Sequence, residues 1–117
     1  MNNRKFIIVA IYILFFCGKS FGQNYFDAAS KEYFSGDLNK SIELFSKSIN
    51  ANQHPANSFM LRGAAKSFLG KFDEALNDLN HSFLLDSTNA KIYYYYGKFY
   101  ILKKEFYEAL KYIFILF

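Results

Sequence analysis

Cysteine is almost absent from this chain, which has one among its 117 residues. That residue, Cys17, lies in an N-terminal segment that has the pattern of a removable secretory signal. Cleavage of this segment would leave a mature protein without cysteine. Disulfide bonds, thiol catalysis and cysteine-ligated metal sites would then all be excluded.

A long hydrophobic run is also missing. Residues 6–17, FIIVAIYILFFC, carry no charge, but a helix of that length spans only about 18 Å, whereas the hydrocarbon core of a bilayer is about 30 Å thick. The run follows the basic start MNNRK and precedes small residues at Ser20 and Gly22. This order predicts a signal peptide over 1–22, cleaved before Gln23.

Two alternatives to cleavage stay open. The segment could remain as a membrane anchor, or Cys17 could be lipidated. Lipoprotein signals place a small residue before the cysteine, whereas Phe16 stands there, so lipidation fits the sequence less well. We expect an exported bacterial protein, located in the periplasm or the cell envelope, or secreted.

Excess basic charge is missing once the signal is set aside. The whole chain has a formal charge of +4, but Arg4, Lys5 and Lys19 lie in the predicted signal. The remaining chain has eleven Lys and Arg against ten acidic residues, so it offers no basic face. We therefore expect no nucleic-acid partner.

Converging catalytic or metal-binding side chains are missing too. His54 and His81 have no second ligand at metal-binding spacing, and we interpret both as surface residues. We interpret Asp73, Glu74 and Asp78 as a solvated acidic face, the first two in the first turn of a helix, where the helix dipole favours anions. No calcium loop or phosphate-binding glycine loop is present. We predict that the protein is not an enzyme and uses no metal or cofactor.

What the sequence does contain is apolar material and an internal repeat. Apolar residues make up 52% of the chain and aromatic residues 21%, enough for the core of one small domain. The phrases GDLNKSI (36–42), GKFDEAL (70–76) and KEFYEAL (104–110) lie 34 residues apart. The same spacing relates four columns: Leu38, Phe72 and Phe106; Ser41, Ala75 and Ala109; Phe45, Leu79 and Ile113; Tyr25, Phe59 and Tyr93. Several columns in one register indicate a real repeat.

Within each period the apolar spacing is helical. Gly70 divides the two runs of the second copy and suits the left-handed residue that ends a helix. Pro55 fits the first turn of a helix, and Ser87, Thr88 and Asn89 supply capping side chains. We predict helix–turn–helix pairs with helices at 24–35, 38–51, 56–69, 72–85, 90–103 and 106–117.

These columns resemble the tetratricopeptide repeat (TPR), a 34-residue helical hairpin. Its first helix carries an aromatic residue, a glycine and a tyrosine, and its second an alanine, an aromatic residue and an alanine. The second copy matches through Phe59, Gly63, Ala75, Leu79 and Ser82; the third through Tyr93, Tyr96, Gly97, Tyr100 and Ala109; and the first, more loosely, through Tyr25, Ala28, Ala29, Ser41, Phe45 and Ser48. The resemblance covers 23–117 and implies an all-α fold, an α-solenoid of about three hairpins following the N-terminal signal helix, at about 22–55, 56–89 and an incomplete 90–117.

Small residues in these columns predict a close contact between paired helices. First-helix positions are expected to face second-helix positions in the pairs Ala29 with Ser41, Gly63 with Ala75, and Gly97 with Ala109. A single hairpin cannot cover its own apolar stripe, so stability would come from stacking on the next hairpin.

The resemblance also implies that the first helices line a groove for an extended peptide or a partner helix. On the side opposite the packing columns, the predicted groove residues are Phe26, Ser30, Tyr33, Met60, Ala64, Ser67, Tyr94, Lys98 and Ile101. This set is aromatic and apolar with one base, so it predicts a protein or peptide partner with apolar or aromatic anchors. For Phe26 and Met60, packing between adjacent first helices is an equally good interpretation.

One TPR subfamily binds the acidic C-terminal tails of chaperones through lysine and asparagine side chains on these helices. The matching positions here are Phe26, Ser30, Leu61, Lys91 and Tyr95. Only Lys91 is of the required type, so the resemblance does not predict that activity.

The stretch EALKYIFILF departs from the family pattern at Phe114, Ile115 and Leu116, where polar or small residues are expected. We consider two hypotheses: the sequence is the N-terminal part of a longer TPR protein, or it presents an apolar tail that docks to a partner or a membrane. Lys104 replaces the turn glycine of the earlier copies, and left-handed geometry there would cost about 1–2 kcal/mol.

Together these features predict a protein–protein interaction scaffold or adaptor built from tetratricopeptide repeats. Two alternatives remain: the recognition arm of a longer, truncated enzyme or sensor, and a signal-anchored membrane assembly factor. Contact with a membrane is expected only through the N-terminal segment or the apolar C-terminal tail.

Overall fold

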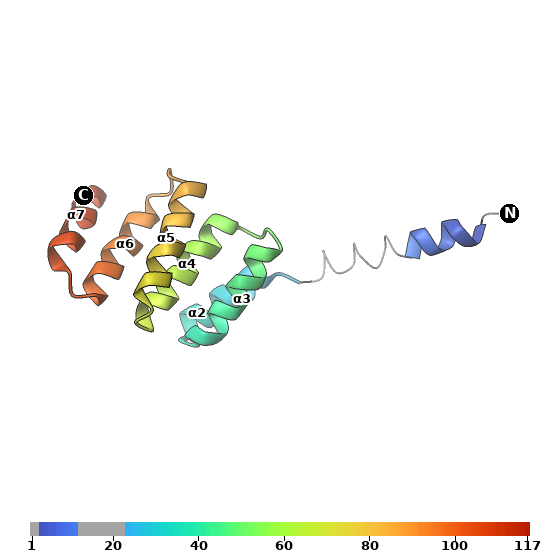
Figure 1. The fold of residues 1–117 in the computed structure, drawn as a ribbon, viewed down its shortest axis with the longest axis horizontal. Helices are drawn as coiled ribbons and strands as arrows, with labels where there is room; N and C mark the ends of the chain where they lie inside the picture. The colour runs from blue at the N-terminus through green and yellow to red at the C-terminus, as the bar shows by residue number, and fades with distance from the viewer. Residues whose placement is uncertain (1–2, 12–22) are drawn as a thin grey trace.

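A computed structural model describes residues 3–11 and 23–117. Residues 3–11 are helical and exposed, whereas Cys17 and the predicted cleavage site lie outside the described residues. The described residues form helices and no strands, which confirms the all-α class. Beyond the N-terminal segment the helices are α2 (Tyr25–Ser35), α3 (Leu38–Asn50), α4 (Pro55–Phe68), α5 (Phe72–Leu85), α6 (Lys91–Leu102) and α7 (Phe106–Leu116) (Figure 1).

The helix bounds follow the predicted period. Each helix begins and ends within one residue of its predicted position. The second helices of the pairs begin at Leu38, Phe72 and Phe106, each 34 residues after the one before. The first helices of the pairs do not begin at equal intervals, because α4 begins early, with Pro55 as its first residue.

The turn inside each pair has the same geometry three times. Gly36, Gly70 and Lys104 have positive φ angles of 96°, 76° and 65°. The next N–H then donates to a carbonyl five residues back: Asp37 to Glu32 at 3.0 Å, Lys71 to Lys66 at 2.9 Å, and Glu105 to Tyr100 at 2.8 Å. This pattern satisfies carbonyls at the helix end, and Lys104 keeps the left-handed geometry despite its Cβ.

Capping before α6 differs in detail from the expectation. Asn89 does cap the helix, because its Oδ1 accepts the N–H of Lys91 at 3.1 Å, although the residue just before the helix is Ala90. Thr88 donates instead to the carboxylate of Asp86, through its hydroxyl at 2.6 Å and its N–H at 3.0 Å. The bonds with Asp86 shape the preceding turn.

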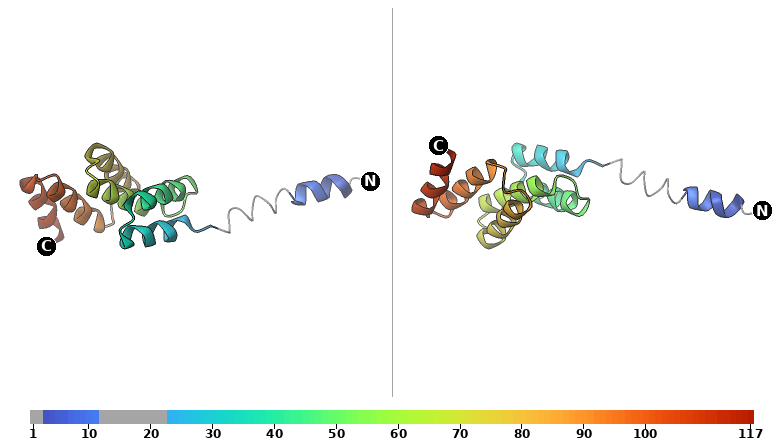
Figure 2. Two further views of the ribbon diagram at one scale, coloured as in Figure 1. Left: turned by 90° about the horizontal axis from the view of Figure 1, so that it is seen from below. Right: turned by 90° about the horizontal axis from the view of Figure 1, so that it is seen from above.

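The helices pack as adjacent pairs in chain order, α2 with α3, α4 with α5, and α6 with α7 (Figures 1 and 2). Between pairs, α3 packs on α4 and α5 on α6. The first helices also contact each other in the row α2–α4–α6, whereas α3, α5 and α7 make no contacts among themselves. Among the described helices, the first helices therefore lie on the inner side of the row and the second helices on the outer side.

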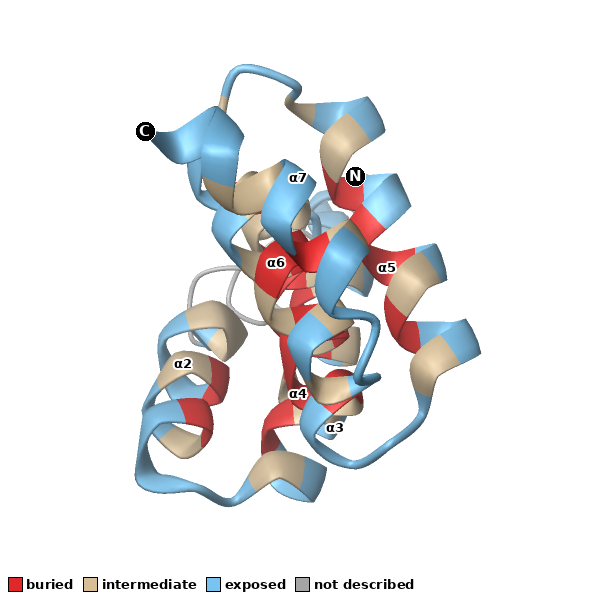
Figure 3. Ribbon diagram, turned by 90° about the vertical axis from the view of Figure 1, so that its left-hand side faces the viewer, coloured by how far each residue is buried: buried red, intermediate tan, exposed pale blue. Residues whose placement is uncertain are grey.

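The predicted close contact is present between Gly63 and Ala75 and, less tightly, between Gly97 and Ala109, where an added Cβ would lie 3.9 Å from the Ala109 carbonyl oxygen. A Cβ added to Gly63 would lie 3.0 Å from the Ala75 carbonyl oxygen, so the two backbones nearly touch. Ala29, Ser41 and Ala75 are fully buried. Figure 3 shows the buried residues concentrated where α4, α5 and α6 meet.

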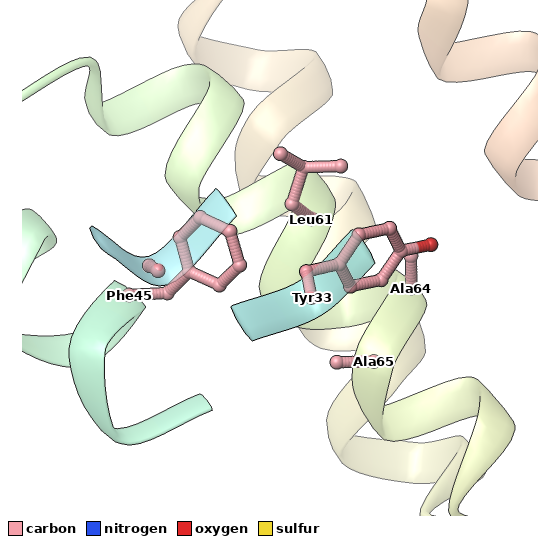
Figure 4. Close-up of a cluster of buried hydrophobic side chains, with 6 residues drawn as sticks. Tyr33, Phe45, Leu61, Ala64 and Ala65 are labelled. Carbon is pink, nitrogen blue, oxygen red and sulfur yellow. The ribbon is translucent and has the colours of Figure 1, made fainter. Parts of the chain in front are cut away.

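Two apolar clusters form the core. One joins the first pair to α4 through Ala29, Tyr33, Phe45, Leu61, Ala64 and Ala65. Figure 4 shows Tyr33 and Phe45 of the first pair beside Leu61, Ala64 and Ala65 of α4. The other joins α4, α5 and α6 through Met60, Ala75, Leu79, Ile92, Tyr96 and Phe99. Each cluster takes residues from two neighbouring helix pairs, so no single pair could bury either cluster alone.

Asp78 corrects the interpretation of an acidic face. Asp73 and Glu74 are exposed in the first turn of α5 as expected, but the side chain of Asp78 is only 1% exposed. Its carboxylate accepts two hydrogen bonds from Arg62 and forms an ion pair with Lys66, both on α4. The physical reason is its helical position, three residues after Ala75, which points it at α4 and not at solvent.

Candidate functional site

A pocket of about 340 Å³ lies on the inner side of the row of first helices. All three first helices contribute to it, together with the turn before α6. Its lining residues are Phe26, Ser30 and Phe34; Asn57, Met60 and Leu61; and Asn89, Lys91 and Tyr95. Helical spacing explains the set, because residues three or four apart share one face of a helix.

The N-terminal end of α2, which carries Phe26, is held by the loop between α3 and α4. The Gln53 side-chain oxygen accepts the N–H groups of Tyr25 at 2.8 Å and Phe26 at 3.2 Å, while its amide nitrogen donates to the Gln23 carbonyl at 2.7 Å. The ring of Phe26 lies 4.7 Å from that of His54. The loop therefore fixes one wall of the pocket.

One end of the pocket is polar. The Asn89 side-chain amide donates to Asn57 Oδ1 at 3.2 Å, which links the start of α4 to the start of α6. Lys91 is exposed beside them. No carboxylate lines the pocket, and no acidic side chain in the described ranges pairs with the Lys91 ammonium. This end of the pocket is therefore positively charged and offers hydrogen-bond donors.

The hydroxyl of Ser30 is buried and has no hydrogen-bond partner within the part of the chain that the structure describes. A buried polar group without a partner costs about 1–3 kcal/mol. Because Ser30 lines the pocket, an acceptor or donor on a bound ligand would remove this cost.

Tyrosine side chains border the apolar part. Burial raises the pKa of Tyr95, and the neighbouring Tyr94 adds to the shift. Burial also raises the pKa of Tyr33, which packs in the first cluster. Both phenols are therefore neutral at physiological pH and contribute a hydrogen-bond donor but no charge.

The predicted groove residues fall into three groups. Phe26, Ser30 and Met60 line the pocket. Tyr33 and Ala64 are buried in the first cluster, and Ser67 is buried with its hydroxyl donating to the Gly63 carbonyl at 2.8 Å.

The third group lies on α6 outside the pocket. Tyr94 and Ile101 are nearly half exposed. The Lys98 ammonium lies over two aromatic rings, 4.6 Å from the centre of Phe68 and 5.4 Å from that of Tyr94. The one base in the pocket is Lys91, which lies seven residues before Lys98 on α6.

Six lining residues were not among the predicted groove residues: Phe34, Asn57, Leu61, Asn89, Lys91 and Tyr95. A signal for three of them was present. The five positions that match the tail-binding TPR subfamily, Phe26, Ser30, Leu61, Lys91 and Tyr95, all line this one pocket. Phe34, Asn57 and Asn89 have no comparable signal, because their place depends on how the hairpins stack.

Within residues 3–11 and 23–117, no helix is both long and apolar enough to cross a membrane. The same residues contain no group of three or more His, Cys, Asp or Glu side chains placed to hold a metal ion. No protein-family model and no curated protein matches this chain.

Proposed function

We propose that residues 23–117 are a TPR-type binding module, and that the pocket between α2, α4 and α6 holds an extended segment of a partner protein. The observation that carries this proposal is the composition of the pocket wall. Three successive first helices converge on one cavity, and the five positions that match the tail-binding TPR subfamily, which are Phe26, Ser30, Leu61, Lys91 and Tyr95, all line it.

The repeat geometry supports the TPR identity. The second helices begin at intervals of 34 residues, the turns inside the pairs share one hydrogen-bond pattern, and small residues meet at the first-to-second helix contact. The row of contacting first helices supports a curved α-solenoid, which has its binding surface on the inner side.

The lining chemistry supports a ligand with two parts. Phe26, Phe34, Met60, Leu61 and Tyr95 offer an apolar and aromatic surface, which suits an aromatic or aliphatic anchor. Lys91 and the unpartnered Ser30 hydroxyl suit a carbonyl or carboxylate oxygen next to that anchor. The proposed ligand is a peptide that combines the two, and a purely acidic segment would leave most of the wall without contacts.

Peptides selected from a displayed random library on the purified full chain test this proposal. The dissociation constant of the best peptide is then measured by fluorescence anisotropy for variants of two exposed lining residues, Phe34→Ser and Lys91→Glu. Both are expected to weaken binding at least tenfold, because each removes a direct contact and neither is part of the core.

Matched controls change one aromatic residue and one lysine outside the pocket. Tyr107, 76% exposed, and Lys71 do not line it, so Tyr107→Ser and Lys71→Glu are expected to alter the dissociation constant by less than twofold. Equal losses in the test and control variants, or peptides that bind all four variants as the wild type, would show that this pocket is not the binding site.

We propose further that the module acts after export. The support is the order of the first 22 residues: a basic start, an uncharged run of twelve and a small-residue end. N-terminal sequencing of the protein recovered from the envelope of an expressing bacterium is expected to begin at Gln23. A chain that begins at Met1 and fractionates with membranes would favour the signal-anchored alternative.

A further inference from the structure

The backbone at Gln23 is held in place by a side chain from another hairpin element. Gln53 Nε2 donates to the Gln23 carbonyl at 2.7 Å, and Gln53 Oε1 accepts the first two N–H groups of α2. The Asn24 side chain accepts the third, that of Asp27, at 3.1 Å. These bonds satisfy N–H groups that the first turn of a helix leaves without partners. They also fix where the residue before the helix cap lies.

Gln53 is itself held by the loop between α3 and α4. The residues on either side, Asn52 and His54, have left-handed backbones with φ angles of 56° and 43°, which are uncommon for residues that carry a Cβ. The Gln53 carbonyl accepts the hydroxyls of Ser48 at 2.7 Å and Ser58 at 2.9 Å. A strained backbone persists only where its surroundings determine it. This loop therefore presents the Gln53 side chain to the start of α2 in one orientation.

We propose that Gln23 is a modification site, at which the N-terminal glutamine of the mature protein closes to pyroglutamate. The inference rests on the proposed cleavage before Gln23, because the reaction needs a free α-amine. The neutral amine nitrogen bonds to the side-chain Cδ, and the bond from Cδ to Nε2 breaks. One amine proton passes to the leaving nitrogen, which departs as ammonia. The reaction consumes no oxidant, cofactor or second substrate.

The fold leaves the reacting atoms of Gln23 accessible. The residue is exposed, and within residues 3–11 and 23–117 its side chain makes no hydrogen bond. The backbone carbonyl that Gln53 holds lies outside the five-membered ring that forms. Cyclisation therefore leaves the bond from Gln53 and the cap of α2 unchanged.

Charge at the start of α2 favours the cyclised form. A free terminus would place an ammonium group two residues before Tyr25, the first residue of α2, at the end where the helix dipole is positive. Asp27 is the acidic residue of the first turn, and its carboxylate already accepts the Asn24 side-chain amide at 2.6 Å. Pyroglutamate carries no charge at this place, so it removes the repulsion with the dipole.

The modification also protects the wall of the pocket. General aminopeptidases act on a free α-amine, which pyroglutamate lacks. Stepwise removal of Gln23 and Asn24 would take away the acceptor of Gln53 Nε2 and the cap of α2. The first turn of α2 would then fray, and this turn carries Phe26 of the pocket wall. A cyclised terminus keeps that turn in place.

The full sequence, expressed with its own N-terminal segment and recovered from the bacterial envelope, tests the proposal. Its intact mass is measured before any digestion. We expect the mass of residues 23–117 less one ammonia, with the loss located at Gln23 in the tryptic peptide QNYFDAASK, residues 23–31. Mass-spectrometric sequencing reads this terminus directly. Edman degradation is expected to give no sequence until pyroglutamyl aminopeptidase removes the ring, and then to begin at Asn24.

Gln23→Ala is the matched control, because it keeps a small start for the mature chain but has no side-chain amide. We expect its full mass without loss of ammonia and an Edman sequence that begins at residue 23. A general aminopeptidase should shorten this variant past Asn24 and leave the wild type intact. In the shortened chain the Phe26 amide should exchange its hydrogen at least tenfold faster, because the bond network at the start of α2 is gone.

The outcomes separate this inference from the proposed export. A terminus that begins with an intact Gln23 would overturn the inference and leave the proposed cleavage standing. A terminus at any other residue would overturn the proposed cleavage, and the inference with it. Equal shortening of the wild type and Gln23→Ala by the aminopeptidase would overturn the protective role.

Discussion

The carboxylate of Asp78 on α5 accepts two parallel hydrogen bonds from the guanidinium of Arg62 on α4, both 2.8 Å long. Lys66 adds a third contact at 3.0 Å from one turn further along α4. The carboxylate is almost fully buried, while the two cations are each less than one-fifth exposed. These three charged side chains therefore hold α4 and α5 together. In the α6–α7 pair, the rings of Tyr96 and Tyr112 stack with their centres 4.9 Å apart.

Removing Asp78 should destabilise the protein strongly. Asp78→Ala leaves Arg62 and Lys66 desolvated without a partner, and we expect the free energy of unfolding to fall by about 3–5 kcal/mol. Urea denaturation followed by circular dichroism measures this. Glu74→Ala is the control, because Glu74 lies 4.0 Å from the same lysine but is 63% exposed, so its loss should cost less than about 1 kcal/mol. Similar costs for both variants would contradict a structural role for the buried group.

The two helix-packing glycines should respond differently to alanine. In Gly63→Ala the new Cβ would lie 3.0 Å from the Ala75 carbonyl oxygen and 3.1 Å from Leu79 Cγ, and we expect a loss of about 1–3 kcal/mol. In Gly97→Ala the nearest atom is Ile113 Cγ1 at 3.5 Å, an ordinary contact. The higher helix propensity of alanine should then leave stability unchanged or raise it by up to about 1 kcal/mol. Thermal unfolding of both variants compares them, and equal losses would contradict the tighter contact in the middle pair.

Lys104 should be replaceable by glycine with a gain. Its φ angle of 65° is left-handed, where a Cβ is strained, and Gly36 and Gly70 occupy the equivalent turns. We expect Lys104→Gly to raise the free energy of unfolding by about 1 kcal/mol. The neighbouring Lys103 has an ordinary φ of −76°, so Lys103→Gly should lower it by about 0.5–1 kcal/mol. Urea denaturation of the two variants decides the sign of each change.

Stability should fall at alkaline pH because of Tyr96. Burial, with the nearby Tyr112, raises the pKa of Tyr96 from 10.0 to about 12. Below pH 10 the phenol is neutral in both states and this contribution is fully present. As the pH rises from 10 through 12, the unfolded chain releases the Tyr96 proton before the folded chain does. The free energy of unfolding therefore falls by a total of about 2–3 kcal/mol.

The free energy of unfolding between pH 8 and pH 12 measures this loss. Tyr96→Phe should be less stable at neutral pH, since it leaves Asn80 Oδ1 without its donor, but its stability should fall less steeply above pH 10. Parallel pH profiles for the two proteins would show that other groups cause the alkaline loss.

Much of the local structure could be predicted from the sequence, because it depends on neighbours along the chain. Helix ends follow from residues such as Pro55 and Gly70, whose backbone preferences act locally. The contact between Gly63 and Ala75 follows from the repeat, since three copies constrain one another. The acidic type of Asp78 predicts a solvated position, whereas its place on the packing face of α5 buries it.

The candidate site was predictable only in part. Helical spacing and the family resemblance brought out Phe26, Ser30 and Met60, which line the pocket. The same reasoning placed Tyr94 and Ile101 beside them, but these α6 residues lie outside the cavity. Which face of a helix meets the pocket depends on how that helix is rotated against its neighbours, and periodicity within one helix does not fix that rotation.

The period, the helix ends and the small residues at which helices meet can be read from the amino-acid order, because each depends on a local conformational preference or on the recurrence of the same residue type. The packing of the helices against one another brings Lys91 and Tyr95 to the same cavity as Phe26 and Ser30, and it buries Asp78. Those relations join residues on different hairpins, and their distances are set by the stacking of whole helices, a property of the assembled row that no single stretch of sequence carries.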